Sequence, residues 1–148
     1  MLISNHGKNL IREFEGLKLN AYQDSGGIWT IGYGYTGMIN GKKIDTDTVF
    51  TKEMAEFYLN TEVEKISKLI TNLLKVKLNQ YQFDAIGSLV YNIGLGNFSK
   101  SRLLRYINNS EFSFAADEFI RWNKCKGRIL HGLTFRRMKE KELFIRKE

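Results

Sequence analysis

The spacing of apolar and polar positions predicts helices over most of this chain. Apolar side chains recur every three or four positions from Ala55 to Leu73, which indicates a long amphipathic helix with Thr51 as its N-cap. A second apolar helix is predicted from Gln80 to Ile93, and Gly94 is placed to end it in the αL conformation. Shorter helices are expected near residues 5–15, 101–107, 112–122 and 134–146.

Residues 17–44 show a different pattern, which is typical of a small antiparallel sheet. The run 28–31 is β-branched and aromatic, and the Asn-Gly pair at 40–41 is a strong signal for a two-residue hairpin turn. Glycine alternates with tyrosine over residues 32–35, which leaves one strand face nearly bare. That alternation predicts either a bulge or a close approach of the backbone to another group, such as a polymer in a cleft.

These elements together predict an α+β fold. A chain of 148 residues, of which 43% are apolar, is long enough to bury one core. We therefore expect a single domain over residues 1–148, in which a small antiparallel β-sheet lobe at about 15–50 is joined to a larger, mainly α-helical lobe. The helical lobe is expected to comprise residues 51–148 together with the 1–14 helix, and an active-site cleft is expected between the lobes.

The net charge of +7 lies entirely at the end of the chain. Residues 1–120 hold 13 basic and 13 acidic side chains, whereas residues 121–148 hold 10 basic and 3 acidic ones. Such an end attracts polyanions, and charge alone does not choose among nucleic acid, anionic lipid and an anionic cell wall. Alternatively, the predicted helix over 134–146 packs Phe135, Met138 and Leu143 inward and has no partner for its charged outer face.

The composition argues against several other kinds of site. The one cysteine, Cys125, has no partner for an internal disulfide and is expected to be a small apolar residue. His6 and His131 have no second histidine or cysteine at metal-binding spacing, so no metal and no cofactor are expected. No segment approaches the roughly 18 apolar residues of a membrane span, and the first residues do not follow the pattern of a signal peptide.

Two carboxylates in unlike surroundings form the candidate chemical site. Glu15 is predicted at a helix end among apolar neighbours, which would favour its protonated form, whereas Asp24 lies in a polar turn that would keep it charged. Cleavage of a glycosidic bond requires such a pair, an acid for the leaving oxygen and a nucleophile or base for the other side of the sugar. Spacing alone is weak evidence, because Glu and Asp a few positions apart are common and mostly solvated, and a residue such as Thr30 is more often an ordinary strand threonine bonded to the backbone.

The longer motif around these residues is more specific. Residues 15–34, EGLKLNAYQDSGGIWTIGYG, resemble the signature of phage-type lysozymes, glycoside hydrolase family 24. In that family a Glu, eight residues, an Asp, five residues and a Thr form the catalytic set, and Glu15, Asp24 and Thr30 match it. The resemblance continues through motifs at 80–86, 92–94, 98–101, 119–122 and 132–137, so it covers nearly the whole chain.

The resemblance implies a lysozyme-like fold and a muramidase. Such an enzyme hydrolyses the β-1,4 bonds between N-acetylmuramic acid and N-acetylglucosamine in peptidoglycan and so lyses the host cell. Glu15 would be the general acid, while Asp24 and Thr30 would position and activate the attacking water, which suits an inverting displacement.

The resemblance also implies substrate contacts, at Gly34, Tyr91 and Ser101. Tyr91 could equally be an aromatic residue of the helix core. Many relatives have histidine where this chain has Tyr35, which puts in doubt any ion pair made at that position but not the catalytic set.

Partners and location follow from the same resemblance. We expect synthesis in the cytoplasm of a bacterial host, followed by action at the cell wall or periplasm once a holin has permeabilised the membrane. The protein is expected to act as a monomer, without specific nucleic-acid binding, and its basic C-terminal region could contact anionic envelope surfaces. Two other functions stay open, a lytic transglycosylase, which Asp24 and Thr30 argue against, and a non-enzymatic polyanion-binding protein.

Overall fold

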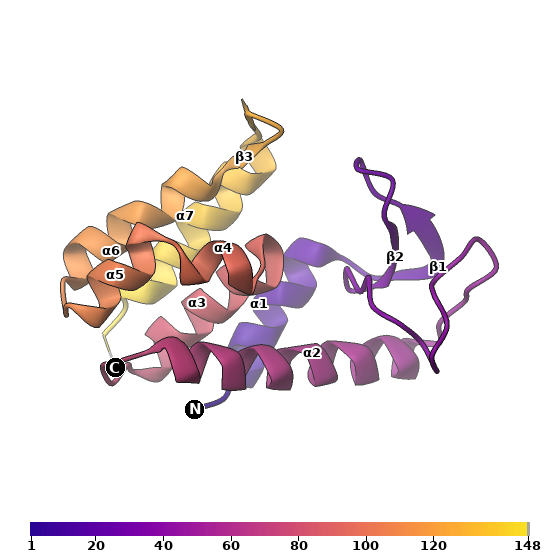
Figure 1. Ribbon diagram of the computed structural model, residues 1–148, viewed down its shortest axis with the longest axis horizontal. Helices are drawn as coiled ribbons and strands as arrows, with labels where there is room; N and C mark the ends of the chain where they lie inside the picture. The colour runs from indigo at the N-terminus through magenta and orange to yellow at the C-terminus, as the bar shows by residue number, and fades with distance from the viewer. Residues whose placement is uncertain (148) are drawn as a thin grey trace. The chain divides into compact units, whose positions relative to one another are not determined.

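The computed structural model describes residues 1–147, so the last residue of the range 51–148 lies outside it. The chain divides into two compact units, each of which is described by itself (Figure 1). The smaller unit comprises residues 11–62, and the larger one comprises residues 1–10 together with the chain from residue 63 onward. The larger unit is mainly helical with one short two-stranded sheet, and the smaller one contains the other two-stranded sheet.

The helices lie close to their predicted positions. The first three along the chain are α1 (Asn5–Glu15), α2 (Lys52–Leu73), which is the longest of the described helices, and α3 (Gln80–Ile93). Thr51 caps α2 as predicted, because its Oγ1 accepts a hydrogen bond from the backbone N–H of Met54 at 3.1 Å. Asn79 and Gln82 form a reciprocal capping box at the start of α3. The others are α4 (Leu95–Ser99), α5 (Arg102–Asn108), α6 (Phe112–Glu118), the 3₁₀ helix η1 (Phe119–Trp122) and α7 (His131–Ile145).

The sheet of the smaller unit is an antiparallel hairpin with an irregular first strand. Its strands are β1 (Lys18–Gln23) and β2 (Trp29–Gly32). Tyr22 pairs with Thr30, but the register shifts between Lys18 and Tyr22. In this bulge the backbone of Leu19 turns to a different partner, because its carbonyl accepts a 2.8 Å hydrogen bond from Phe50. The bulge therefore changes the direction of β1 just before the residues that precede Asp24.

The Asn-Gly hairpin predicted at 40–41 is present. Ile39 and Lys42 exchange backbone hydrogen bonds of 2.8 and 2.9 Å across the turn. Asn40 and Gly41 both have positive φ, 49° and 77°, which is the backbone of a type I′ turn.

The core of the larger unit is built around α3. Residues 83–90 of this helix are all buried, α7 packs along it, and α6 packs against both α5 and α7 (Figure 1). The N-terminal segment is held against the same helix, because a Cβ on Gly87 would lie only 2.4 Å from Cδ1 of Ile3. Buried Asp84 accepts a 2.8 Å hydrogen bond from the backbone N–H of Ser4.

Three details of the helical part differ from the sequence-based expectation. Gly94 has a positive φ of 89°, but its ψ of 154° is not αL, so that prediction is wrong; its N–H still donates to the Val90 carbonyl at 2.8 Å. The helix α4 was not anticipated, and neither was a second hairpin. Its strands are β3 (Lys124–Cys125) and β4 (Arg128–Ile129).

The buried face of α7 differs in part from the predicted one. Phe135 and Met138 are 53% and 52% exposed, so the prediction that they pack inward is wrong, although Leu143 is buried as expected. Arg136 and Arg137 are buried instead, at 4% and 0% exposure. Two of the cations in the basic C-terminal region therefore point inward, and the surface is less positive than the sequence suggested.

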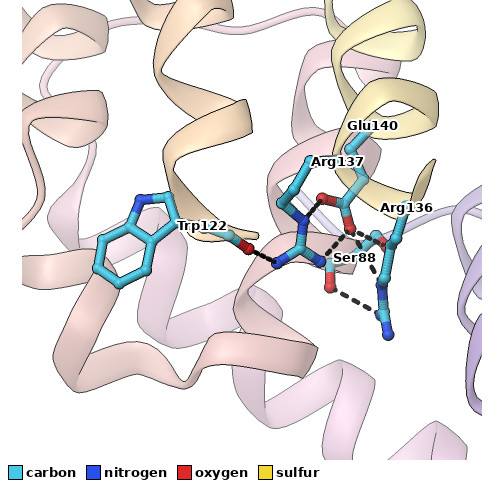
Figure 2. Close-up of polar contacts among 5 residues, drawn as sticks. All are labelled: Ser88, Trp122, Arg136, Arg137 and Glu140. Carbon is cyan, nitrogen blue, oxygen red and sulfur yellow. Dashed lines mark hydrogen bonds and ion pairs between the residues drawn. The ribbon is translucent and has the colours of Figure 1, made fainter. Parts of the chain in front are cut away.

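A hydrogen-bonded network accounts for this burial (Figure 2). Oε2 of Glu140 accepts hydrogen bonds from Ser88 Oγ at 2.6 Å, Arg136 Nε at 3.2 Å and Arg137 Nη2 at 3.1 Å. Arg137 also donates to the Trp122 carbonyl at 3.1 Å, and its Nε lies 2.7 Å from Glu140 Oε1 without hydrogen-bond geometry. Burial raises the pKa of Glu140, while the charges of Arg137 and Arg136 and the Ser88 hydrogen bond oppose that shift.

Among residues 1–147, no helix is long and apolar enough to cross a membrane. Over the same residues, no group of three or more His, Cys, Asp or Glu side chains is placed to hold a metal ion. Cys125 is a free thiol of intermediate exposure in β3.

Candidate active site

The three predicted catalytic residues belong to the smaller unit. Glu15 is the last residue of α1, Asp24 directly follows β1, and Thr30 lies in β2. The end of one helix and the loop and second strand of one hairpin therefore position the set.

Glu15 lies against the backbone of a tight turn. Ile31 and Tyr35 exchange backbone hydrogen bonds of 2.9 and 2.8 Å, which closes the turn around Gly34. Gly34 has a φ of 76°, and a Cβ added to it would lie 2.7 Å from Glu15 Oε1. The close approach that the glycine-tyrosine alternation predicted is thus made to the Glu15 carboxylate, and only glycine leaves room for it.

An ion pair holds the elements around Glu15 together. Arg12, one helical turn before Glu15, contacts Glu56 on α2 with Nη2 2.7 Å from Oε2 and Nε 3.1 Å from Oε1. The hydroxyl of Tyr33, in the turn that contains Gly34, donates to the same carboxylate at 3.4 Å. The hydrogen bond from Arg12 lowers the pKa of Glu56 below its ordinary value, so this carboxylate accepts from both neighbours across the neutral range.

Asp24 is fixed by the backbone of its own loop. Its Oδ1 accepts hydrogen bonds from the N–H groups of Gly26 at 2.8 Å and Ile28 at 2.9 Å. Its backbone N–H also donates to the Ile28 carbonyl at 2.9 Å. Oδ2 has no hydrogen-bond partner in the described part of the chain, and the residue is exposed. One oxygen therefore orients the carboxylate and the other remains available to accept a proton.

The hydroxyl group of Thr30 already donates a hydrogen bond to the backbone. Its side chain is buried at 4% exposure, and Oγ1 donates its hydrogen to the Ile28 carbonyl at 2.9 Å. This is the backbone bond expected of an ordinary strand threonine. It also makes the hydroxyl oxygen an acceptor for any further partner, because the hydrogen is already in use.

The predicted substrate contacts Tyr91 and Ser101 belong to the larger unit. Tyr91 is half-buried near the end of α3. Ser101 caps α5, since its Oγ accepts from the Leu104 N–H at 3.0 Å and donates to the Phe98 carbonyl at 2.7 Å. A substrate role for Gly34, Tyr91 and Ser101 stays a prediction.

Tyr35, at the position where many relatives have histidine, uses its hydroxyl locally. The group donates to the Met38 carbonyl at 2.5 Å, and the ring lies 4.6 Å from that of Tyr58. This tyrosine therefore stabilises the loop that follows the Gly34 turn.

Tyr22 is a neighbour of the site that the sequence analysis missed. It lies opposite Thr30 in the hairpin. Its pKa is raised above the ordinary value, first by burial and then by the negative charges of Glu15 and Asp24. The available signal was its place two residues before Asp24, because residues two apart in a strand lie on the same face.

Replacing Gly34 by Ala is expected to lower activity by about tenfold or more, because displacing a reacting group by about 1 Å has effects of this size or larger. The added Cβ would meet Glu15 Oε1 at 2.7 Å. An alanine held at this positive φ should also lower the free energy of unfolding by about 1–2 kcal/mol. Thermal unfolding and release of reducing ends from peptidoglycan measure the two effects.

The matched control for this prediction is Gly41→Ala. Gly41 has nearly the same φ, 77°, but a Cβ there meets nothing within 4 Å. It should lose similar stability and keep its activity. Equal activities of the two variants would contradict a role for Gly34 in placing Glu15.

The chain is similar to known proteins over nearly its whole length. The family model described as phage lysozyme matches residues 12–140. The endolysin of Acyrthosiphon pisum secondary endosymbiont phage 1 is 43% identical, over 97% of this chain and 98% of that protein. The endolysin of Bacillus phage B103 is 42% identical over 98% of this chain, which spans only 54% of that longer relative. The structure of the endolysin from Escherichia coli O157:H7 phage FAHEc1 matches with a TM-score of 0.88 and 37% identity, over 98% of this chain and 94% of that one. The chain therefore belongs to the phage lysozyme family, and it is a muramidase-type glycoside hydrolase.

Proposed function

We propose that this chain hydrolyses the β-1,4 bonds between N-acetylmuramic acid and N-acetylglucosamine in peptidoglycan. Glu15 acts as the general acid, and Asp24 and Thr30 bind and activate the attacking water. The observation that carries the proposal is the asymmetry of Asp24, whose Oδ1 is held by two backbone N–H groups while Oδ2 has no partner among residues 1–147. A carboxylate oriented in this way is suited to accept a proton from water.

Glu15 supplies the proton for the leaving group. As the glycosidic C–O bond breaks, its electron pair stays on the leaving oxygen, which takes the proton from the Glu15 carboxyl. The position of Gly34 supports this role: a Cβ there would lie 2.7 Å from Glu15 Oε1, so the turn restricts the orientations of the carboxyl group.

Asp24 and Thr30 hold the water on the other side. The water donates one hydrogen to Asp24 Oδ2 and the other to Thr30 Oγ1, which can only accept because its own hydrogen is bonded to the Ile28 carbonyl. A water with both hydrogens engaged presents a lone pair to the anomeric carbon, and its proton passes to Asp24 as the new C–O bond forms. This arrangement suits an inverting displacement.

Two observations argue against the alternative functions, a lytic transglycosylase and a polyanion-binding protein. A lytic transglycosylase needs no bound water, because a hydroxyl of the sugar itself attacks, and the Asp24 arrangement would then have no purpose. A polyanion-binding protein would present its cations to solvent, whereas Arg136 and Arg137 are buried against Glu140. Both observations favour the hydrolase.

The test of the water site uses Asp24→Asn and Thr30→Val. Asp24→Asn keeps an oxygen for the two backbone N–H groups but removes the base, so activity should fall by about 10²–10⁴-fold with little change in melting temperature. Thr30→Val is nearly isosteric and should lower activity by about tenfold or more, since one hydrogen bond to the water is lost.

Thr61→Val is the matched control for Thr30. Thr61 lies in the same unit, and its Oγ1 likewise donates to a backbone carbonyl, that of Phe57 at 2.8 Å. If Thr30→Val lost no more activity than Thr61→Val, Thr30 would have no role in holding water.

For access to the wall we propose synthesis in a bacterial host cytoplasm followed by passage through a holin lesion, with the protein acting as a monomer. The support is membership of the phage lysozyme family and the endolysin names of its relatives. Expression in a Gram-negative host should leave the culture turbid until a holin or chloroform is added. Lysis by this chain alone would contradict the proposal.

A further inference from the structure

Tyr22 lies directly beside Thr30, a member of the candidate catalytic set, on the neighbouring strand. Tyr22 is the direct antiparallel partner of Thr30, and side chains of directly opposed residues lie on the same face of a hairpin. The bulge between Lys18 and Tyr22 redirects β1 before this pair forms. Bulges of this kind commonly re-aim a side chain next to an active site. Tyr22 and Thr30 therefore face the same side.

Both carboxylates of the set act on the Tyr22 phenol. Burial raises the pKa of this phenol, and the negative charges of Glu15 and Asp24 raise it further. The phenol therefore keeps its proton across the neutral range and is a hydrogen-bond donor.

That donor has no partner within residues 1–147. The two other tyrosines of the hairpin and its turn behave differently, because the Tyr33 hydroxyl donates to Glu56 and the Tyr35 hydroxyl to the Met38 carbonyl. Tyr22 is 37% exposed, so a ligand can reach it. A tyrosine with an apolar ring, an available hydroxyl and partial exposure is typical of a ligand-contacting residue.

We propose that Tyr22 contacts the saccharide at the bond that is cut, with its ring against the sugar and its hydroxyl donating to a sugar oxygen. This inference rests on the proposed function and adds a residue to that site. Asp24 can only accept hydrogen bonds and Thr30 uses its hydrogen on the Ile28 carbonyl. Tyr22 thus supplies the neutral donor that these two residues lack, and it holds the sugar between the acid and the water.

The test compares Tyr22→Phe and Tyr22→Leu on soluble N-acetylated glycan strands prepared from peptidoglycan. Tyr22→Phe removes only the hydroxyl and should lower kcat/KM by about tenfold, the effect of one lost hydrogen bond. Tyr22→Leu also removes the ring and should lose more. Tyr22→Phe should keep the melting temperature within the error of the wild type, because the hydroxyl has no partner among residues 1–147 to lose.

Tyr106→Phe is the matched control, because it also removes only a tyrosine hydroxyl. Tyr106 lies in the larger unit, where its ring stacks on that of Phe114 with 5.5 Å between the centroids. It should retain wild-type activity. Wild-type kcat/KM in Tyr22→Phe, or an equal loss in Tyr106→Phe, would overturn the role of Tyr22.

Binding separates this inference from the proposed function. In a Glu15→Gln background, retention of the same glycan strands on the protein should weaken when Tyr22→Phe is added. If the parent chain releases no products, the proposed hydrolysis fails, and this binding comparison still decides on Tyr22. Unchanged retention with the added substitution would then refute the contact.

Discussion

Glu15→Gln is expected to lower the rate of peptidoglycan hydrolysis by about 10²–10⁴-fold, the usual contribution of a general acid. Glutamine has nearly the same shape as glutamic acid and can occupy the same space beside Gly34, but it has no acidic proton for the leaving oxygen. The fold should therefore survive while the chemistry stops. Release of reducing ends measures the rate, and thermal unfolding measures the stability.

Glu13→Gln is the control for this prediction. Glu13 is an exposed carboxylate of the same helix, two residues before Glu15, so the variant makes the same change of charge. It should hydrolyse peptidoglycan at nearly the wild-type rate. Comparable rates for Glu13→Gln and Glu15→Gln would remove Glu15 from the mechanism.

Glu140→Gln is expected to lower the free energy of unfolding by about 3–5 kcal/mol. Arg137 and Arg136 are 0% and 4% exposed, and the substitution would remove the negative charge of the buried carboxylate that both of them contact in Figure 2. For a chain of this length such a loss corresponds to a fall in melting temperature of about 10–15 °C. Urea unfolding at neutral pH gives the free energy directly.

Glu142→Gln provides the comparison on the same helix. Glu142 is 64% exposed in its side chain, and its ion pair within residues 1–147 is with Lys139 at 3.6 Å, so its loss should change stability by less than about 0.5 kcal/mol. If Glu140→Gln were as mild as this exposed substitution, the buried network would not stabilise the fold.

The long helices were predictable because burial imposes a regular spacing on the sequence. The apolar residues that repeat through α2 and α3 face the interior. The cap at Thr51 marks where α2 begins, and Gly94 follows the last residue of α3, although not in the predicted αL conformation. The turn at 40–41 was equally clear, since two consecutive residues with positive φ favour Asn-Gly.

The orientation of α7 was not predictable from its own residues. Arg136, Arg137 and Glu140 repeat with the same spacing as an apolar stripe. Their burial depends on Ser88, which lies 48 residues away from Arg136 and reaches the network only once α3 and α7 have packed. Local periodicity contains no information about such a distant polar partner. The β3–β4 hairpin was missed for a simpler reason, because two-residue strands show no alternation.

The residues of the candidate catalytic set could be predicted from the sequence, but the residues next to them that position the set could not. The spacing of Glu15, Asp24 and Thr30 is a motif that the sequence displays directly. The roles of Gly34 and Tyr22 depend on three-dimensional proximity, namely the turn that meets Glu15 and the bulge that aligns Tyr22 with Thr30. Neither feature follows from spacing alone.

The most direct test of the proposed water-dependent hydrolysis is digestion of purified peptidoglycan in water enriched in heavy oxygen, with the released glycans identified by mass spectrometry. Attack by the water held at Asp24 and Thr30 places heavy oxygen on the new reducing end of each fragment, and no label should be incorporated with Glu15→Gln. Fragments that end in an unlabelled anhydro ring would instead mean that the sugar's own hydroxyl attacks, and would contradict the account.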